Sequence, residues 1–190
     1  MKKVEKLSHW NKRVEKISVA FLAEFGRLQE KELNWKPAPE RWSIAQIMDH
    51  MITTNESYFP VFEEIKEGRY HTPGMGKIPF IPTLMGKMIL KTVQPETKRK
   101  SKTFGIWEPV QSNIPIGITE RFARHQQDLM AHIKSMEDFL DRNIIINSPL
   151  SNYIVYSLDD AIEILVAHEE RHLNQARAVR HLMNQAVRKD

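Results

Sequence analysis

Hydrophobic residues recur at alternating steps of three and four along four stretches of the chain, a spacing that gathers them on one face of an α-helix. The first stretch covers residues 4–32, the second begins at Ser43, the third covers about 118–142, and the fourth begins at Ser157. We find no convincing pair of β-strands between them. The pattern therefore predicts an all-α chain in which four long helices pack as a four-helix bundle.

Local signals mark where two of these helices begin. The serine and glutamine of a capping box are present at Ser43 and Gln46, so each side chain is expected to bond the other's backbone N–H group. Ser157 and Asp160 resemble the same box with aspartate in place of glutamate. Pro60 lies inside the second stretch and predicts a kink in that helix.

The helical pattern fails between residues 67 and 117, which hold six of the ten prolines and six of the seven glycines. A connection this long within a compact domain usually has a function of its own, such as that of a lid. Only Thr83 to Leu90 is predicted to form a short helix. The length also allows the second and third helices to run parallel. We therefore expect one domain, residues 1–190, with a long irregular connection that is a candidate lid.

Composition narrows the functional classes. Apolar residues make up 41% and charged residues 27% of the 190 residues, as in ordinary globular proteins. Cysteine is absent, which excludes disulfides, thiolate ligands and a cysteine nucleophile, and which fits a reducing cytoplasm. The most apolar segment, Ile78 to Leu90, is interrupted by prolines, glycine and lysine, so no membrane partner is expected. We also see no signal peptide.

The net charge is +4, and much of the excess lies between Lys98 and Lys102. Such a run is compatible with binding nucleic-acid phosphates. A solvated loop is the favoured interpretation, because the total charge is small and no aromatic residues alternate with the basic ones. Nucleic acid is therefore not expected as a partner.

The candidate chemistry lies in the fourth helix. His168 and His172 are four residues apart, which puts them on one helical face with Cβ atoms about 5–6 Å apart. They replace apolar residues in the buried stripe. His50 borders the apolar face of the second helix, so packing of the two helices is expected to bring it opposite the pair. Three neutral imidazoles with open positions are typical of a catalytic metal site. The alternative is three histidines at the edge of the core that bond to carbonyls or water.

The sequence at 168–172 also matches H-E-x-x-H, the motif of zinc peptidases, in which Glu169 would be the general base. The extended form of the motif needs a glycine and a histidine at the positions of Gln175 and Ala178. The other form takes a glutamate from a later helix as its third ligand, but no glutamate follows His172. A peptidase is therefore disfavoured. Glu169 projects about 100° around the helix from His168, so we do not expect it to be a base. Gln175 is a candidate to orient a ligand.

Several other residues have two interpretations each. His125 and His132 share one face of the third helix, beside a buried seam that includes Gln126; they either line a pocket or, as we favour, lie at the surface. Trp42 either anchors the start of a helix or contacts substrate. Trp107 either covers the histidines as part of a lid or fastens the long connection to the bundle.

Residues 35–50, which read WKPAPERWSIAQIMDH, and residues 168–175, which read HEERHLNQ, resemble the two signatures of the DinB-like superfamily. The resemblance implies a four-helix bundle that binds a divalent metal through His50, His168 and His172, and it implies homodimers. Characterised members include S-transferases and isomerases that use bacillithiol, mycothiol or glutathione, and others are described as metal-dependent hydrolases. Arg171 and Arg177 would then be candidates to meet an anionic thiol cosubstrate.

These observations predict a metal-dependent enzyme that activates a thiol or water for a small-molecule substrate, with thiol S-transfer or hydrolysis as the reaction. Imidazole suits several metals; zinc or nickel is expected first, with iron or manganese as alternatives, and a low-molecular-weight thiol is the expected cosubstrate. A second hypothesis, from another class, is a non-catalytic stress-related or interaction protein whose metal site is structural or vestigial.

Overall fold

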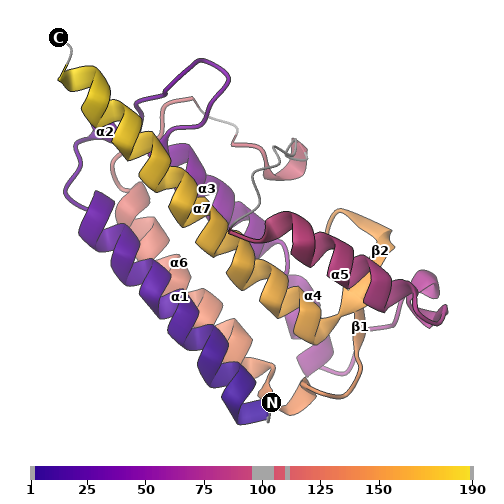
Figure 1. The fold of residues 1–190 in the computed structure, drawn as a ribbon. Coiled ribbons are helices and arrows are strands. Elements are labelled where there is room, and N and C mark those ends of the chain that lie inside the picture. The colour runs from indigo at the N-terminus through magenta and orange to yellow at the C-terminus, as the bar shows by residue number, and fades with distance from the viewer. Residues whose placement is uncertain (1–2, 96–104, 110–111, 189–190) are drawn as a thin grey trace.

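The structure is a computed structural model that describes residues 3–95, 105–109 and 112–188. The basic run at Lys98 to Lys102 lies outside these residues. The described part is mostly helical and contains one small sheet (Figure 1). The elements follow in the order α1 (Lys3–Phe25), α2 (Glu30–Leu33), α3 (Ile44–Glu56), α4 (Phe59–Lys66), α5 (Ile81–Val93), α6 (Ile118–Ser135), β1 (Ile145–Ser148), β2 (Ser151–Ser157) and α7 (Leu158–Val187), with 3₁₀ turns at Gly74–Lys77, Gly105–Trp107 and Glu137–Phe139.

Helices α1, α3, α6 and α7 surround the core. Both α1 and α3 pack against α6 and α7. One end of the core joins the starts of α1 and α7 to the end of α6, and the other joins the ends of α1 and α7 to the starts of α3 and α6. Hence α1 and α7 run one way, while α3 and α6 run the other way. The all-α prediction is confirmed, and α3 and α6 are parallel, as the long connection allows.

The two ends of the core are separate apolar clusters. Between them α3, α6 and α7 contribute buried polar side chains instead of hydrophobic ones. We call this set the central polar layer; it consists of Asn55, His125, Gln126 and Glu169, each at most 3% exposed. Buried polar groups destabilise a core unless they form hydrogen bonds. Hydrophobic packing alone therefore does not explain why the sequence has polar residues in this layer.

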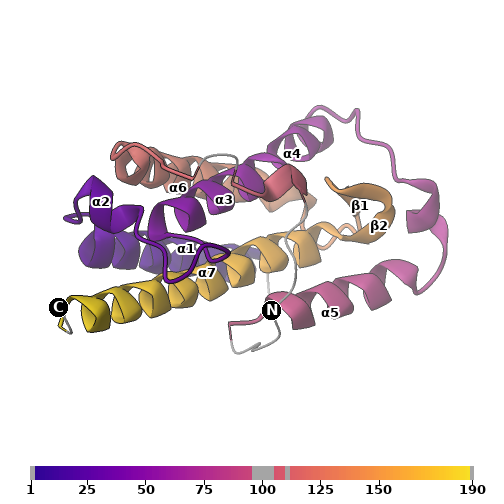
Figure 2. The ribbon, with the colours of Figure 1, turned by 90° about the horizontal axis from the view of Figure 1, so that it is seen from above.

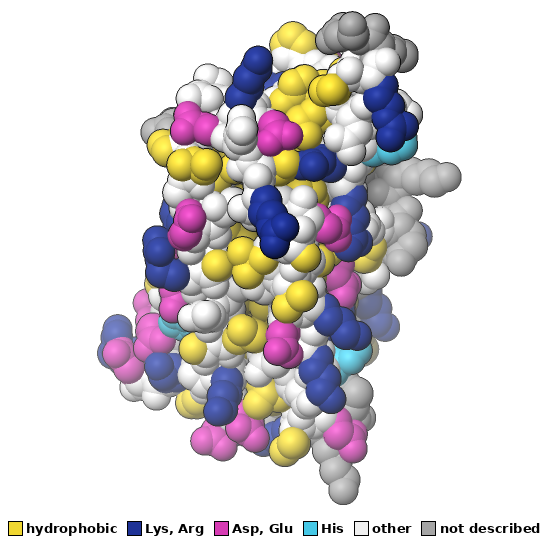
Figure 3. Space-filling view, turned by 90° about the vertical axis from the view of Figure 1, so that its left-hand side faces the viewer, with side chains coloured by type: hydrophobic (Ala, Val, Ile, Leu, Met, Phe, Trp, Pro, Cys, Tyr) yellow, Lys and Arg dark blue, Asp and Glu magenta, His cyan; other side chains and the backbone are white. Residues whose placement is uncertain are grey.

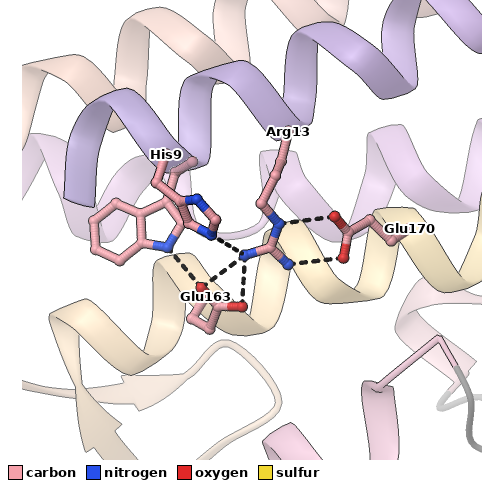
Figure 4. Close-up of polar contacts among 5 residues, drawn as sticks. His9, Arg13, Glu163 and Glu170 are labelled. Carbon is pink, nitrogen blue, oxygen red and sulfur yellow. Dashed lines mark hydrogen bonds and ion pairs between the residues drawn. The ribbon is translucent and has the colours of Figure 1, made fainter. Parts of the chain in front are cut away.

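A different polar cluster fastens the outer side of α7 to α1 (Figure 4). The Arg13 guanidinium donates to both oxygens of Glu163 at 2.7 and 2.9 Å and to both oxygens of Glu170 at 2.7 Å. The Trp10 indole also donates to Glu163, at 2.7 Å, and His9 lies 3.5 Å from the guanidinium. We call these residues the Arg13 cluster. It is half-buried, so water still reaches part of each charge.

The predicted helix starts are confirmed. The Ser43 hydroxyl accepts from the backbone N–H of Gln46, and the Gln46 side chain accepts from the N–H of Ser43, both at 3.2 Å. The Ser157 hydroxyl accepts from the N–H of Asp160 at 3.0 Å, which begins α7. The second predicted helix is divided into α3 and α4, with Pro60 in the first turn of α4. Proline fits there because the first N–H groups of a helix have no intrahelical partner.

Two helices are shorter than predicted. The first stretch was expected to be helical over residues 4–32, but α1 ends at Phe25 and Gly26 follows, because glycine weakens a helix interior. A separate helix, α2, then begins after Gln29. The third stretch was expected to reach residue 142, but α6 ends at Ser135.

The expectation of no strand pair was wrong. Strands β1 and β2 form an antiparallel hairpin in which Ile145 pairs with Ser157, and an irregularity interrupts the register after Asn147. The strands are too short to show an alternating pattern clearly. Tertiary contacts hold them, since Tyr156 is 1% exposed and its hydroxyl lies 2.6 Å from that of Tyr58.

The long connection contains more structure than its sequence suggested. Helix α5 is longer than the predicted 83–90 segment and packs against β2 and α7 (Figure 2). Gly86 permits this contact, because a Cβ atom there would lie 2.7 Å from the Asp160 carboxylate. Among the described residues, no helix is long and apolar enough to cross a membrane. On the face shown in Figure 3, charges of both signs are interspersed with hydrophobic side chains.

Candidate metal centre

His50 from α3 meets His168 and His172 from α7. The Nε2 atom of His168 lies 3.2 Å from that of His50 and 3.0 Å from that of His172. One ring nitrogen of each residue lies within 4.8 Å of the others, and the three form a group able to hold a metal ion. The predicted convergence of these three residues is therefore confirmed.

The spacing of the rings can be compared with that of a metal site. Zinc–nitrogen bonds of about 2.0–2.1 Å in a tetrahedron separate neighbouring nitrogens by roughly 3.3 Å. The two separations given above, 3.2 and 3.0 Å, are close to this value. Three imidazole donors on helices that are already packed together therefore fit a divalent cation, with at least one position left for another ligand.

A backbone carbonyl from the long connection fixes the orientation of His50. Its Nδ1 atom lies 2.7 Å from the carbonyl oxygen of Trp107. Because a carbonyl only accepts hydrogen bonds, Nδ1 must donate, which places the proton there and leaves the Nε2 lone pair facing His168. This is the tautomer that a metal-binding Nε2 requires, and a carbonyl on the other ring nitrogen is a common support for such a ligand.

Burial keeps the three rings neutral. It lowers the pKa of His50 to about 4, against the opposing effects of the Trp107 carbonyl and Asp49. Burial also lowers the pKa of His168 and of His172 far below the usual value, and in each case a neighbouring histidine adds to the effect. Metal binding needs deprotonated imidazole, so near neutral pH the three candidate ligands are already in the required form.

Two tryptophans contact the group in different ways. The Trp42 ring lies 4.7 Å from the His50 ring and 6.2 Å from the His172 ring, measured between centroids. Trp107 donates from its indole to Ser57 at 3.1 Å, while its carbonyl holds His50. These two contacts support the second of the roles considered above, in which Trp107 fastens the long connection to the bundle. The 3₁₀ turn that carries Trp107 contacts α3.

Glu169 does not face the histidines. It is fully buried in the central polar layer, where one of its oxygens, Oε1, accepts from Asn55 and from Gln126 at 2.8 Å each. Burial raises the pKa of Glu169 to about 7, although both hydrogen bonds act in the opposite direction. This position agrees with the prediction that Glu169 is not a base at the site, and it removes the basis for a peptidase.

Of the two further candidates on α6, the expected surface position was wrong for His125. It is 3% exposed, and its Nε2 atom accepts from the Asn55 amide at 3.1 Å. His132 is partly exposed, and its ring stacks on Phe59 at 3.9 Å between centroids. Neither ring joins the metal-binding group. Glu56 approaches the other nitrogen of His125 at 3.8 Å.

The remaining candidates near the site differ in position. Gln175 acts on His172 only weakly, by raising its pKa against the larger lowering effect of burial, so its role as a residue that orients a ligand stays a prediction. Arg171 donates to the backbone carbonyl of Thr92 at the end of α5. Arg177 instead forms an ion pair with Glu24 on α1, and this pair lies at the surface of the protein.

Sequence reasoning missed two contributors to the site. One is the carbonyl of Trp107, which as a backbone atom leaves no trace in the sequence. The other is Asn55, whose partner Glu169 is 114 positions away in the chain. Gln126 could have been identified from the sequence, because it is a polar residue in an otherwise apolar helical seam.

Comparison with known proteins agrees with this geometry. A model of the DinB superfamily matches residues 14–176, which include both signature segments and all three histidines. No curated protein and no solved structure gave a match. The match covers most of the chain, so this chain belongs to the DinB superfamily.

Proposed function

We propose that this protein is a metal-dependent enzyme in which His50, His168 and His172 hold one divalent cation. The reaction proposed is the transfer of a low-molecular-weight thiol to a small electrophile, with hydrolysis as the alternative outcome at the same site. The observation that carries the proposal is the convergence of three imidazoles, in which the Nε2 atom of His168 lies at separations suited to a shared metal from those of His50 and His172.

A cation held this way would lower the pKa of a bound thiol or water, so that a nucleophile forms near neutral pH. The chain's own residues have simpler tasks. The imidazoles bind, the Trp107 carbonyl orients His50, and Trp42 shields the rings from water. No general base is required, which is consistent with the position of Glu169 in the core.

The thiol must come from outside the chain, because the sequence contains no cysteine. Zinc or nickel is the proposed metal, with iron or manganese as alternatives, since imidazole binds all of these and the geometry alone does not choose among them. A homodimer and a cytoplasmic location complete the proposal; the first rests on the family resemblance and the second on the lack of cysteine.

Metal content is the first test. Protein purified without a nickel column is expected to contain about one divalent ion per chain by elemental analysis, and His168→Ala is expected to contain almost none. His181→Ala is a matched control, because His181 is an exposed histidine on the same helix. If wild type lacks metal after incubation with zinc or nickel, or if His168→Ala retains it, the proposal fails.

Activity is the second test. Metal-loaded protein is incubated with a chromogenic electrophile and a panel of low-molecular-weight thiols, and consumption of the electrophile is followed. S-transfer predicts a rate that needs both metal and thiol and that disappears in His168→Ala. A metal-bound protein that neither transfers a thiol nor hydrolyses an ester or amide panel would instead support the non-catalytic alternative.

A further inference from the structure

We propose that Glu169 is a positioning residue for the metal centre. Its buried carboxyl, held by Asn55 and Gln126, fixes α3 against α7 so that His50 and His168 remain at ligand distance. The inference rests on the proposed function, because it concerns the same three histidines, but it assigns a task to residues that do not touch the cation.

The first support is the pattern of hydrogen bonds. Asn55 on α3 and Gln126 on α6 each donate to the Oε1 atom of Glu169 on α7, both at 2.8 Å. All three side chains are fully buried. One carboxyl oxygen therefore joins three helices at a single point, and two of these helices carry the metal-binding histidines.

The second support is the position of this point relative to the histidines. Asn55 lies five residues after His50, about 7.5 Å along α3, whereas Glu169 directly follows His168 on α7. The two helices are thus connected at the ring pair His50–His168 and again about one and a half turns along α3. Two separated connections prevent the rotation and sliding that a single connection would allow.

The third support is energetic. The central polar layer lies between two apolar clusters, where hydrophobic side chains of similar volume would hold the helices together at least as well. Apolar contact is non-directional, however, while a hydrogen bond defines a distance and an angle. A polar connection at this position is explained if the relative placement of α3 and α7 matters more than the strength of their association.

Replacing the whole connection by apolar groups separates positioning from stability. In the triple variant Asn55→Leu/Gln126→Met/Glu169→Met no donor or acceptor of these three side chains remains, and only the His125 Nε2 atom loses a partner. Its apo form is therefore expected to fold and to be more stable in urea than Glu169→Met. Its affinity for zinc, measured by competition with a chromogenic chelator, is expected to fall roughly tenfold or more, as in other metal sites that lose supporting contacts.

Two further variants complete the design. In Glu169→Gln the side-chain carbonyl still accepts from both amides, so zinc affinity is expected to stay within about threefold of wild type. Arg13→Met is the matched control, because it removes a polar connection between α7 and α1, which carries no ligand. It is expected to lower stability while leaving zinc affinity unchanged within about twofold.

Each result has a definite consequence. Zinc affinity of the triple variant equal to that of wild type overturns the inference and leaves the proposed function standing. An equal loss in Glu169→Gln and in the triple variant overturns positioning in favour of an effect of charge. If the triple variant fails to fold, Asn55→Leu alone replaces it, with the same expected loss of zinc affinity and the same overturning result. A wild-type protein that binds no zinc, nickel, iron or manganese overturns both proposals.

Discussion

Helix α7 is fastened on two sides by polar groups of opposite character. Toward α1, Arg13 forms ion pairs with Glu163 and Glu170, whose side chains are 31% and 29% exposed. Toward α3 and α6, Glu169 accepts from two neutral amides and is fully buried. The ion pairs lie where water can still solvate them, and the hydrogen bonds of Glu169 lie where water does not reach.

The protonation behaviour of the two connections differs for the same reason. Burial acts against the charged form of Arg13, but its hydrogen bonds with Glu170 and Glu163 outweigh this effect and raise its pKa. For Glu169 burial is the larger effect, and the pKa is raised to about 7. A charge at the edge of the bundle is thus kept, while a charge in its centre is disfavoured. This difference agrees with the proposal that the outer connection supports the fold and the inner one positions the candidate metal ligands.

The largest expected effect comes from breaking the inner connection on one side only. Glu169→Met leaves the Asn55 and Gln126 amides buried without their acceptor, which is expected to lower the free energy of unfolding by about 3 kcal/mol. Urea unfolding of the apo protein measures it. Removing the two amides as well, as in the triple variant, should recover most of this stability, although His125 then loses its bond with Asn55. A Glu169→Met variant as stable as wild type would show that the inner connection contributes nothing to stability.

The next effect is a pH dependence through His125. Burial lowers its pKa to about 4; Asp128 opposes this shift, while Arg121 and His132 add to it. The folded state then binds fewer protons than the unfolded state between pH 4 and the unfolded value of about 6.5, so stability falls as the pH drops through this window. The loss attributable to His125 is about 2–3 kcal/mol.

The variant His125→Gln isolates this contribution to stability. The buried residues His50, His168 and His172 contribute equally to the pH dependence of wild type and variant, so their effect cancels in the difference. The difference in unfolding free energy between wild type and variant, measured in urea at pH 7 and pH 4, should change by the stated amount. An unchanged difference would mean that His125 titrates normally.

A smaller effect is expected from the outer connection. Arg13→Met is predicted to lower the free energy of unfolding by about 1–2 kcal/mol, because Glu163 and Glu170 remain partly solvated when their partner is lost. Urea unfolding at low salt is the measurement. A loss larger than that of Glu169→Met would reverse the comparison between the two connections.

The smallest effect is that of salt. Exposed charges are screened within about 3 Å at 1 M salt, whereas a fully buried hydrogen bond is screened much less. The stability difference between wild type and Arg13→Met should therefore shrink by up to about half between 0.1 and 1 M sodium chloride. The difference between wild type and Glu169→Met should stay constant because Glu169 is fully buried, and an equal shrinkage of both differences would contradict an inner connection that is shielded from solvent.

The sequence was informative where structure depends on local spacing. Four residues between His168 and His172 defined a shared helical face, and the serines at 43 and 157 marked the helix starts. It was less informative where distant residues meet. The β-hairpin depends on tertiary burial of short strands, and the bond between Asn55 and Glu169 joins residues 114 positions apart. Only the placement of α3 against α7 reveals that bond.

X-ray absorption spectroscopy of the zinc-loaded protein tests the central claim most directly. Convergence of His50, His168 and His172 on one ion predicts a first shell with three imidazole nitrogens at about 2.0–2.1 Å, which falls to two in His50→Ala. A wild-type spectrum with two or fewer imidazoles, or one that His50→Ala leaves unchanged, would contradict the account.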